Sequence, residues 1–310
     1  MVRAQAPQGP TKAFAARSRL VDSTWMNVEP KTLYVIATPI GNLDDITHRA
    51  VNVLRTVDRI AAEDTRRTRA LLSHLGIVGK PVDALHQHSS AHDIARLMSL
   101  LEGGASIALV TDAGTPTVSD PGDALVKAAI LAQVRVVPLP GASAVLAALS
   151  ASGLGNGTGF RFCGFLPRDG TARRHAVATA CSTPEPVILF ESPERTTATL
   201  RELAGAMPDR PVCVARELTK VHEQIVRGTL TELARCENDW RGEITIVLGS
   251  WSPNEHAESI SDEAIDARID HELDAGAHAK TAAERIAAWS GRPKREVYER
   301  VVRRKTSRRQ

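Results

Sequence analysis

The stretch from Leu109 to Gly122, LVTDAGTPTVSDPG, constrains the fold more than any other part of this 310-residue chain. An apolar run of strand length, Ile107–Val110, leads into it, and the loop that follows is rich in Gly, Pro and hydroxyl side chains. Asp120 fits the N-cap and Pro121 the first position of a helix that begins there. Because ligands of open α/β sheets bind in loops at the carboxyl ends of strands, the sequence predicts a ligand loop, with a plain strand-to-helix connection as the alternative.

The first half of the chain repeats a short apolar strand, a turn and a helical pattern about five times, which is typical of a mostly parallel sheet. Leu33–Ala37 precedes the turn TPIGN, after which Asp44 or Asp45 can cap a helix. Pro138–Ala144 forms a second rigid turn before a helix of small residues. Neither a GxGxxG nor a GKS/GKT motif occurs, so the sequence excludes a Rossmann fingerprint and a P-loop.

A glycine-rich segment, GLGNGTG at 153–159, predicts a domain boundary. Beyond it, consecutive strands near 211–227 have no helix between them, which favours a mixed sheet. The predicted organisation is a disordered extension at 1–30, one α/β domain at 31–152, a second at 159–250, and a helical module at 260–310.

Positive charge is concentrated at the C-terminus of the chain. The formal net charge is only +3, yet the segment from Arg292 to Gln310 contains nine Lys or Arg residues and just two acidic residues, Glu296 and Glu299. A basic end on a near-neutral body favours a polyanionic partner. Three short helical patterns at 262–273, 281–289 and 295–303 fit a helix-turn-helix-like module, with an oligomerisation or packing tail as the alternative.

Cysteine usage and hydropathy indicate a reducing, non-membrane location. The four cysteines are widely spaced, with no CxxC pair and no Cys-His cluster of zinc-ligand spacing, so no metal site is expected. No apolar run reaches transmembrane length, and the first 30 residues lack the apolar core of a signal peptide. The expected location is the cytoplasm.

Eight ordered stretches carry a resemblance to a known family. They read LYVIATPIGNLDDIT, AAEDTRRT, LVTDAGTPTVSDPG, PLPGASA, FCGFLPR, FESPERT, RELTKVHE and GEITIVLG. In this order and spacing they resemble the tetrapyrrole-methylase superfamily, and more narrowly its branch of small-subunit ribosomal RNA cytidine 2′-O-methyltransferases. The resemblance spans roughly Leu33 to Gly249. It implies two α/β domains of the tetrapyrrole-methylase type, a cofactor cleft between them and a small C-terminal helical module.

The resemblance further implies S-adenosylmethionine as the cofactor. Its contacts are then expected from Ile40, Asp112, Thr115, Ser143, Ala144, Leu166, Arg216 and Glu243. Porphyrin-methylating members carry a GxGPGD-type loop and a GDP motif, whereas this chain has TPIGN and TDAG in those places. These departures favour the RNA branch over a porphyrin-type substrate. The resemblance to that branch implies 16S rRNA of the small ribosomal subunit, at a decoding-centre cytidine, as the substrate, and the superfamily also suggests a homodimer.

A ribose hydroxyl is a weak nucleophile, so a base or a cationic neighbour is expected near it. The candidates are Glu63, Asp64, His86, Glu191, Lys220 and Glu223, of which Asp64 and Lys220 are favoured. The predicted RNA contacts are Arg66, Arg67, Arg168, Arg195, Arg295 and Arg303. Any of these groups could instead form structural ion pairs.

Three other functions remain open at this point. A small-molecule methyltransferase acting on a tetrapyrrole precursor is the main alternative, and binding to rRNA but not to a tetrapyrrole would exclude it. A non-enzymatic RNA-binding protein would fail to bind the cofactor. A protein methyltransferase is more remote.

Overall fold

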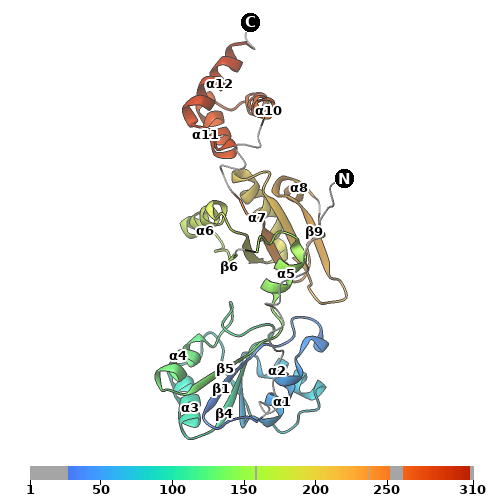
Figure 1. The fold of residues 1–310 in the computed structure, drawn as a ribbon, viewed down its shortest axis with the longest axis vertical. Coiled ribbons are helices and arrows are strands. Elements are labelled where there is room, and N and C mark those ends of the chain that lie inside the picture. The colour runs from blue at the N-terminus through green and yellow to red at the C-terminus, as the bar shows by residue number, and fades with distance from the viewer. Residues whose placement is uncertain (1–26, 158, 237, 252–260, 308–310) are drawn as a thin grey trace, which may run out of the picture.

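The computed structural model describes residues 27–157, 159–236, 238–251 and 261–307. Most of the predicted N-terminal extension, up to residue 26, and residues 252–260, between the second predicted domain and the helical module, lie outside this part of the chain. Figure 1 shows two sheets stacked along the long axis, with three C-terminal helices beyond the second sheet. This arrangement confirms the predicted fold class of two α/β units followed by a helical module.

The first sheet has five parallel strands in the order β3-β2-β4-β1-β5. The strands are β1 (Thr32–Ile36), β2 (Arg59–Ala62), β3 (Val82–Ala84), β4 (Ser106–Val110) and β5 (Arg135–Leu139). The α-helices are α1 (His48–Thr56), α2 (Thr65–His74), α3 (Ala91–Glu102), α4 (Asp123–Leu131) and α5 (Ala144–Ser152). Because β4, β1 and β5 are neighbours and parallel, the loops that follow them open at one edge of the sheet (Figure 1).

Apolar faces of four helices cover the two sides of this sheet. Core residues of α1 and α2 pack on one face and those of α3 and α4 on the other. The fifth helix, α5, behaves differently: Val145 and Ala148 pack against Ile188, Cys213 and Val247 of the second sheet. The helix that follows the PLPGASA turn therefore connects the two sheets physically, and it brings its own N-terminus to the gap between them.

Two predicted helix starts are wrong. The segment Leu43–Asp45 forms a single 3-10 turn, and α1 begins later because Thr47 caps it by accepting a hydrogen bond from the Ala50 amide. Likewise α4 begins at Asp123 after Gly122, so Asp120 does not cap it. Gly122 has a φ of 119° and lies where a Cβ would approach a Leu109 methyl to 2.8 Å, so the chain folds back onto β4 before the helix starts.

The second sheet is mixed, as predicted, with the order β6-β7-β10-β8-β9. Only β6 and β7 are parallel, and the remaining pairs are antiparallel. Its strands are β6 (Arg161–Phe165), β7 (Val187–Glu191), β8 (Pro211–Arg216), β9 (Gln224–Thr229) and β10 (Ile244–Leu248). The helices α6 (Gly170–Ser182), α7 (Pro193–Ala206) and α8 (Leu230–Arg235) pack on the face opposite α5.

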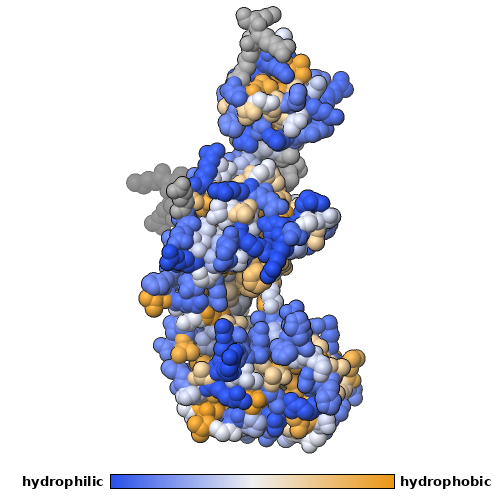
Figure 2. All heavy atoms as spheres, turned by 180° about the vertical axis from the view of Figure 1, so that it is seen from behind, coloured by the Kyte–Doolittle hydropathy of each residue, from blue (hydrophilic) through white to orange (hydrophobic). Residues whose placement is uncertain are grey.

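The C-terminal helices are α10 (Asp262–Asp274), α11 (Ala279–Ser290) and α12 (Lys294–Ser307). Ile265, Ile269 and Ile286 form the centre of their own small core. The indole Nε1 of Trp289 donates to Asp209 Oδ2 at 2.5 Å, which joins this module to the second sheet. Figure 2 shows hydrophilic residues over most of one face of the molecule, with apolar residues in small separate patches.

Candidate active site

A pocket of about 440 Å³ lies between the two sheets. From the first sheet it takes the loops after β1, β4 and β5 and the segment before α2. From the second it takes the ends of β6 and β7 and the start of β10. The lining residues are Ile40, Glu63, Arg67, Asp112, Ala113, Gly114, Thr115, Val118, Ser119, Asp120, Ser143, Ala144, Val145, Phe165, Phe190, Glu191, Ser192, Pro193, Gly242, Glu243, Ile244 and Thr245. The loop at 111–122 supplies more of them than any other segment, which places the predicted ligand loop at the centre of the site.

Hydrogen bonds tie the three loops of the first sheet together. Thr38 and Gly114 exchange two backbone hydrogen bonds of 2.9 and 3.0 Å, and the Thr38 hydroxyl donates to the Thr111 carbonyl at 3.0 Å. The Thr115 hydroxyl donates to the Ala142 carbonyl at 3.2 Å. Since each loop is held by its neighbour, this side of the pocket is a preformed wall.

Three carboxylates gather on that wall. The Asp112 amide donates to Glu63 Oε2 at 3.3 Å, and Asp112 itself accepts from the Asp64 amide at 3.0 Å and lies 3.3 Å from an Arg67 nitrogen. Asp120 has no such partner within the described part of the chain, and burial, together with the negative charges of Glu63 and Asp112, raises its pKa to about 7. The pocket therefore favours a positively charged ligand on this side.

Two glutamates, Glu191 and Glu243, line the opposite wall, and a lysine outside the lining pairs with the second of them. Glu191 is buried and accepts hydrogen bonds from the Thr199 hydroxyl at 2.7 Å and the Ser192 amide at 2.9 Å. Glu243 lies 3.2 Å from Lys220 Nζ, which is 2.8 Å from Glu217. Burial lowers the pKa of Lys220, but the hydrogen bonds to both glutamates outweigh burial and raise it above its usual value, so the ammonium stays protonated near neutral pH.

Most of the cofactor contacts that the resemblance implies meet in this pocket. Those that line it are Ile40, Asp112, Thr115, Ser143, Ala144 and Glu243, joined by Arg67 from the predicted RNA contacts. Leu166 lines instead a neighbouring hollow, together with Arg168 and Arg195. Arg216 is not among the lining residues, although its Nε is buried and has no hydrogen-bond partner among the described residues.

The two favoured catalytic residues lie at the rim of the site rather than in it. Asp64 caps α2 by accepting from the Arg66 amide at 2.7 Å and also pairs with the Arg66 guanidinium. The side-chain hydrogen bond from Arg66 is the main reason why the pKa of Asp64 falls to about 2. Lys220 reaches the pocket only through Glu243. A catalytic role for either residue stays a prediction.

Several pocket residues were not singled out from the sequence. Asp120 is predicted as a helix cap, and Phe165, Phe190 and Thr245 lie in the stretches that carry the family resemblance but are not among the predicted contacts. Position 242 requires glycine, because it has a φ of 72° and a Cβ there would collide with the Glu217 carboxyl. The signal that could have identified Asp120 is the run SDPG, in which a glycine that favours positive φ separates the aspartate from the helix.

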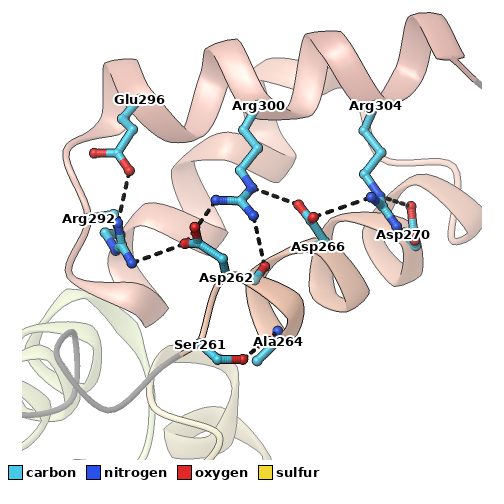
Figure 3. Close-up of polar contacts among 9 residues, drawn as sticks. All are labelled: Ser261, Asp262, Ala264, Asp266, Asp270, Arg292, Glu296, Arg300 and Arg304. Atoms are coloured by element: carbon cyan, nitrogen blue, oxygen red, sulfur yellow. Dashed lines mark hydrogen bonds and ion pairs between the residues drawn. The ribbon is translucent and has the colours of Figure 1, made fainter.

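Some arginines of the C-terminal module form ion pairs within the module itself. Arg300 pairs with Asp262 and Asp266, Arg304 pairs with Asp266 and Asp270, and together they join α12 to α10 (Figure 3). The predicted basic helix therefore does not present all its arginines to a partner. The two residues selected as RNA contacts, Arg295 and Arg303, are exposed, and Arg295 forms an ion pair with Glu299.

The described residues contain no group of three or more His, Cys, Asp or Glu side chains arranged to hold a metal ion. Among the same residues no helix is long and apolar enough to cross a membrane. All four cysteines are free thiols.

Comparison with known proteins identifies the family. Residues 32–234 match the sequence profile of the family described as tetrapyrrole (corrin/porphyrin) methylases. The ribosomal RNA small subunit methyltransferase I of Micromonospora olivasterospora is 45% identical over 87% of this chain and 86% of its own length. The protein of the same name from Xylella fastidiosa strain Temecula1 is 44% identical over 87% of this chain and 98% of its own length.

Among solved structures, the fold is similar to that of uroporphyrin-III C-methyl transferase from Thermus thermophilus complexed with S-adenyl homocysteine. The TM-score is 0.51 at 19% identity, covering 70% of this chain and 97% of that one. The profile match, the relatives and the shared fold agree. The chain therefore belongs to the tetrapyrrole methylase family and, within it, to the ribosomal RNA small subunit methyltransferase I branch.

Proposed function

We propose that this protein methylates ribosomal RNA of the small ribosomal subunit, with S-adenosylmethionine as methyl donor and the 2′-oxygen of a decoding-centre cytidine as acceptor. The observation that carries the proposal is the pocket between the two sheets, whose walls include residues of the stretches that carry the family resemblance. The relatives named above are small-subunit rRNA methyltransferases, which supports RNA rather than a tetrapyrrole as the substrate.

The pocket fits the methyl donor in size and chemistry. Its volume of about 440 Å³ lies within the range of about 300–1,000 Å³ typical of small-molecule sites. The carboxylates of Glu63, Asp112 and Asp120 suit a ligand with a sulfonium and an ammonium group, while Ile40 and Phe190 supply apolar wall. When bound, the donor supplies an electrophilic methyl carbon with a neutral leaving group.

The chain's own residues have two tasks in this reaction. The first is to hold the acceptor oxygen in line with the methyl carbon, which the preformed wall around Thr38, Gly114 and Thr115 supports. The second is to receive the proton of the ribose hydroxyl. Asp120 fits this second role best, because it lines the pocket and its pKa of about 7 lets it accept a proton at neutral pH.

Lys220 and Asp64 take other roles in the proposal. Lys220 is protonated and, paired with Glu217 and Glu243, holds the Glu243 carboxylate in place at the pocket wall. Asp64 positions the start of α2 and, through Arg66, the basic surface beside the pocket. Exposed arginines next to the site and on α12 are the proposed phosphate contacts: Arg66, Arg67, Arg168, Arg295 and Arg303.

The test is transfer of a tritiated methyl group from S-adenosylmethionine to each of two acceptors, unmethylated small ribosomal subunits and a tetrapyrrole precursor. We expect label on the subunits only. Label on the tetrapyrrole alone would overturn the proposal in favour of the small-molecule alternative. The expected homodimer is measured separately, from the molar mass in solution.

A further inference from the structure

Aromatic side chains are concentrated beside the pocket. The chain has only five phenylalanines, and four of them lie between residues 160 and 190. Phe162 and Phe165 of β6 both contact Phe190 of β7, with ring centroids 4.9 and 5.5 Å apart. In a chain with only 4% aromatic residues, this cluster marks the edge of the second sheet next to the pocket.

A β-bulge places Phe165 on this face. The pairing of β6 with β7 shifts between Phe162, which is opposite Ile188, and Phe165, which is opposite Phe190. One extra residue on β6 turns Phe165 to the same side as Phe162, where a regular strand would have turned it away. Gly164 in the bulge has a φ of 63°, and a Cβ there would lie 3.1 Å from the Ser119 hydroxyl in the ligand loop.

The result of the bulge is an exposed ring. Phe165 keeps 58% of its surface accessible, although burial of a phenyl ring would stabilise the fold. It borders two hollows at once: the pocket described above and a neighbouring one lined by Leu166, Pro167, Arg168, Ser192, Glu194 and Arg195. Phe165 and Ser192 are shared by both, so the second hollow opens directly beside the proposed reaction site.

We propose that the face of Phe165 is the platform on which the target nucleobase of the RNA stacks while its ribose enters the pocket. The inference rests on the proposed function and deepens it. Unstacked bases of single-stranded RNA bind to aromatic side chains in this way, and a ring between two hollows can hold the base in one and the ribose in the other.

The charges around the second hollow match such a nucleotide. Arg168 is exposed at its rim and suits the adjacent phosphate. Glu194 is also exposed at this rim. Its carboxylate can accept a hydrogen bond from the amino group of a base, as carboxylates do from cytosine N4. Arg195, which also lines this hollow, pairs with Glu191 and donates to the Leu166 carbonyl, so its guanidinium fixes the wall of the hollow.

The test uses the full chain with Phe165→Leu, which keeps apolar bulk, and Phe165→Trp, which keeps an aromatic face. Phe160→Leu is the matched control, because Phe160 is exposed but is not among the residues that line either hollow. Steady-state methylation of unmethylated small subunits, filter binding of the same subunits without cofactor, and equilibrium binding of S-adenosylmethionine are measured for each variant.

We expect Phe165→Leu to lower kcat/KM for subunits by roughly tenfold or more, in the range of one lost base-stacking contact, with cofactor affinity unchanged. Phe165→Trp should restore most of the kcat/KM that Phe165→Leu loses, because it keeps an aromatic face, and Phe160→Leu should retain wild-type values. Equal activity of the Leu and Trp variants would overturn the platform, and so would a loss of cofactor affinity that accounts for the whole effect. A wild-type protein that methylates no subunit would instead refute the proposed function.

Discussion

Gly41, in the loop after β1, lies directly against Lys220 of the hairpin between β8 and β9. A Cβ placed on Gly41 would collide with Lys220 Cγ and lie 2.8 Å from the Thr219 hydroxyl. The first sheet's loop therefore fits under the second sheet's hairpin only because position 41 has no side chain. Since Lys220 holds Glu243, which lines the pocket, this contact links the spacing of the two sheets to the geometry of the site.

Replacing this glycine tests the link. Gly41→Ala should push the hairpin away and lower kcat/KM for methyl transfer, with an overpacking cost in unfolding free energy of about 1–3 kcal/mol. Gly205→Ala is the control, because Gly205 lies in α7 with no atom within 4 Å of the added methyl. Urea unfolding and initial rates are measured for both. Wild-type rates for Gly41→Ala would show that the close contact does not matter.

Arg210 should be the largest single polar contributor to stability in the second unit. It is fully buried and donates to five backbone carbonyls, those of Ala180, Cys181, Thr183, Glu185 and Gly249. Burial lowers its pKa to about 10, yet it remains charged at neutral pH.

Arg210→Met should lower the free energy of unfolding by about 3 kcal/mol or more, because buried carbonyls lose their donors. Arg201→Ala, a peripheral arginine with one 3.4 Å bond to the Ala234 carbonyl, should change it by less than about 1 kcal/mol. Denaturant unfolding followed by tryptophan fluorescence measures both. A similar, small loss in the two variants would contradict this assignment.

The order and type of the elements follow from the sequence, but several details do not. Alternation of apolar runs and helical patterns predicted the parallel first sheet, since parallel strands need helical crossovers, and consecutive strands without a helix between them predicted the mixed second sheet. The packing of α5 on the second sheet was not predicted. The spacing of Val145 and Ala148 predicts an apolar helix face, but it does not show which sheet that face packs against. The domain boundaries drawn from the glycine-rich segment stay a prediction.

The residues of the site could be predicted only in part. The stretches that carry the family resemblance predicted Asp112, Thr115 and Ser143 as cofactor contacts, and all three line the pocket. Phe165 was missed because a bulge reverses the direction of its side chain, and regular alternation gives no sign of that shift. The inward arginines of α12 were missed because charge counting cannot show that Asp262, Asp266 and Asp270 lie opposite them.

The pKa of Asp120 predicts a pH dependence with a definite sign. The unfolded chain loses the Asp120 proton near the ordinary pKa of 3.8, whereas the folded chain keeps it up to about pH 7. Between these values the folded state binds more protons, so the free energy of unfolding falls as pH rises from about 4 to about 7 and levels off above. Asp120→Asn should remove this decline, as chemical denaturation at several pH values would show.

The same substitution should alter ligand discrimination. S-adenosylmethionine carries a sulfonium charge that S-adenosylhomocysteine lacks, so ionised Asp120 should favour the former. The affinity ratio of the two ligands should rise as pH passes through about 7 in the wild-type protein and stay flat in Asp120→Asn. Calorimetric titration measures the ratio, and a wild-type ratio independent of pH would place the sulfonium away from Asp120.

The arginines of α12 should separate into two classes. Arg300→Ala should loosen α12 from α10, because it breaks ion pairs with Asp262 and Asp266, and the module should melt at lower temperature. Arg295→Ala should leave the melting temperature unchanged, since this side chain is 92% exposed. It should weaken binding to small ribosomal subunits and reduce the slope of log binding constant against log salt concentration by about one. If Arg300→Ala weakened binding to small ribosomal subunits without lowering the melting temperature, Arg300 would be an RNA contact rather than a residue that holds α12 to α10.

The central claim is tested most directly by mapping the methylated nucleotide. Unmethylated small ribosomal subunits are incubated with this protein and tritiated S-adenosylmethionine, and the labelled position and atom are identified by nuclease digestion and mass spectrometry. We expect one label, on the ribose 2′-oxygen of a decoding-centre cytidine, with the rate reduced in Asp120→Asn. A label on a base, or no label on subunits or free rRNA while the cofactor still binds, would contradict it.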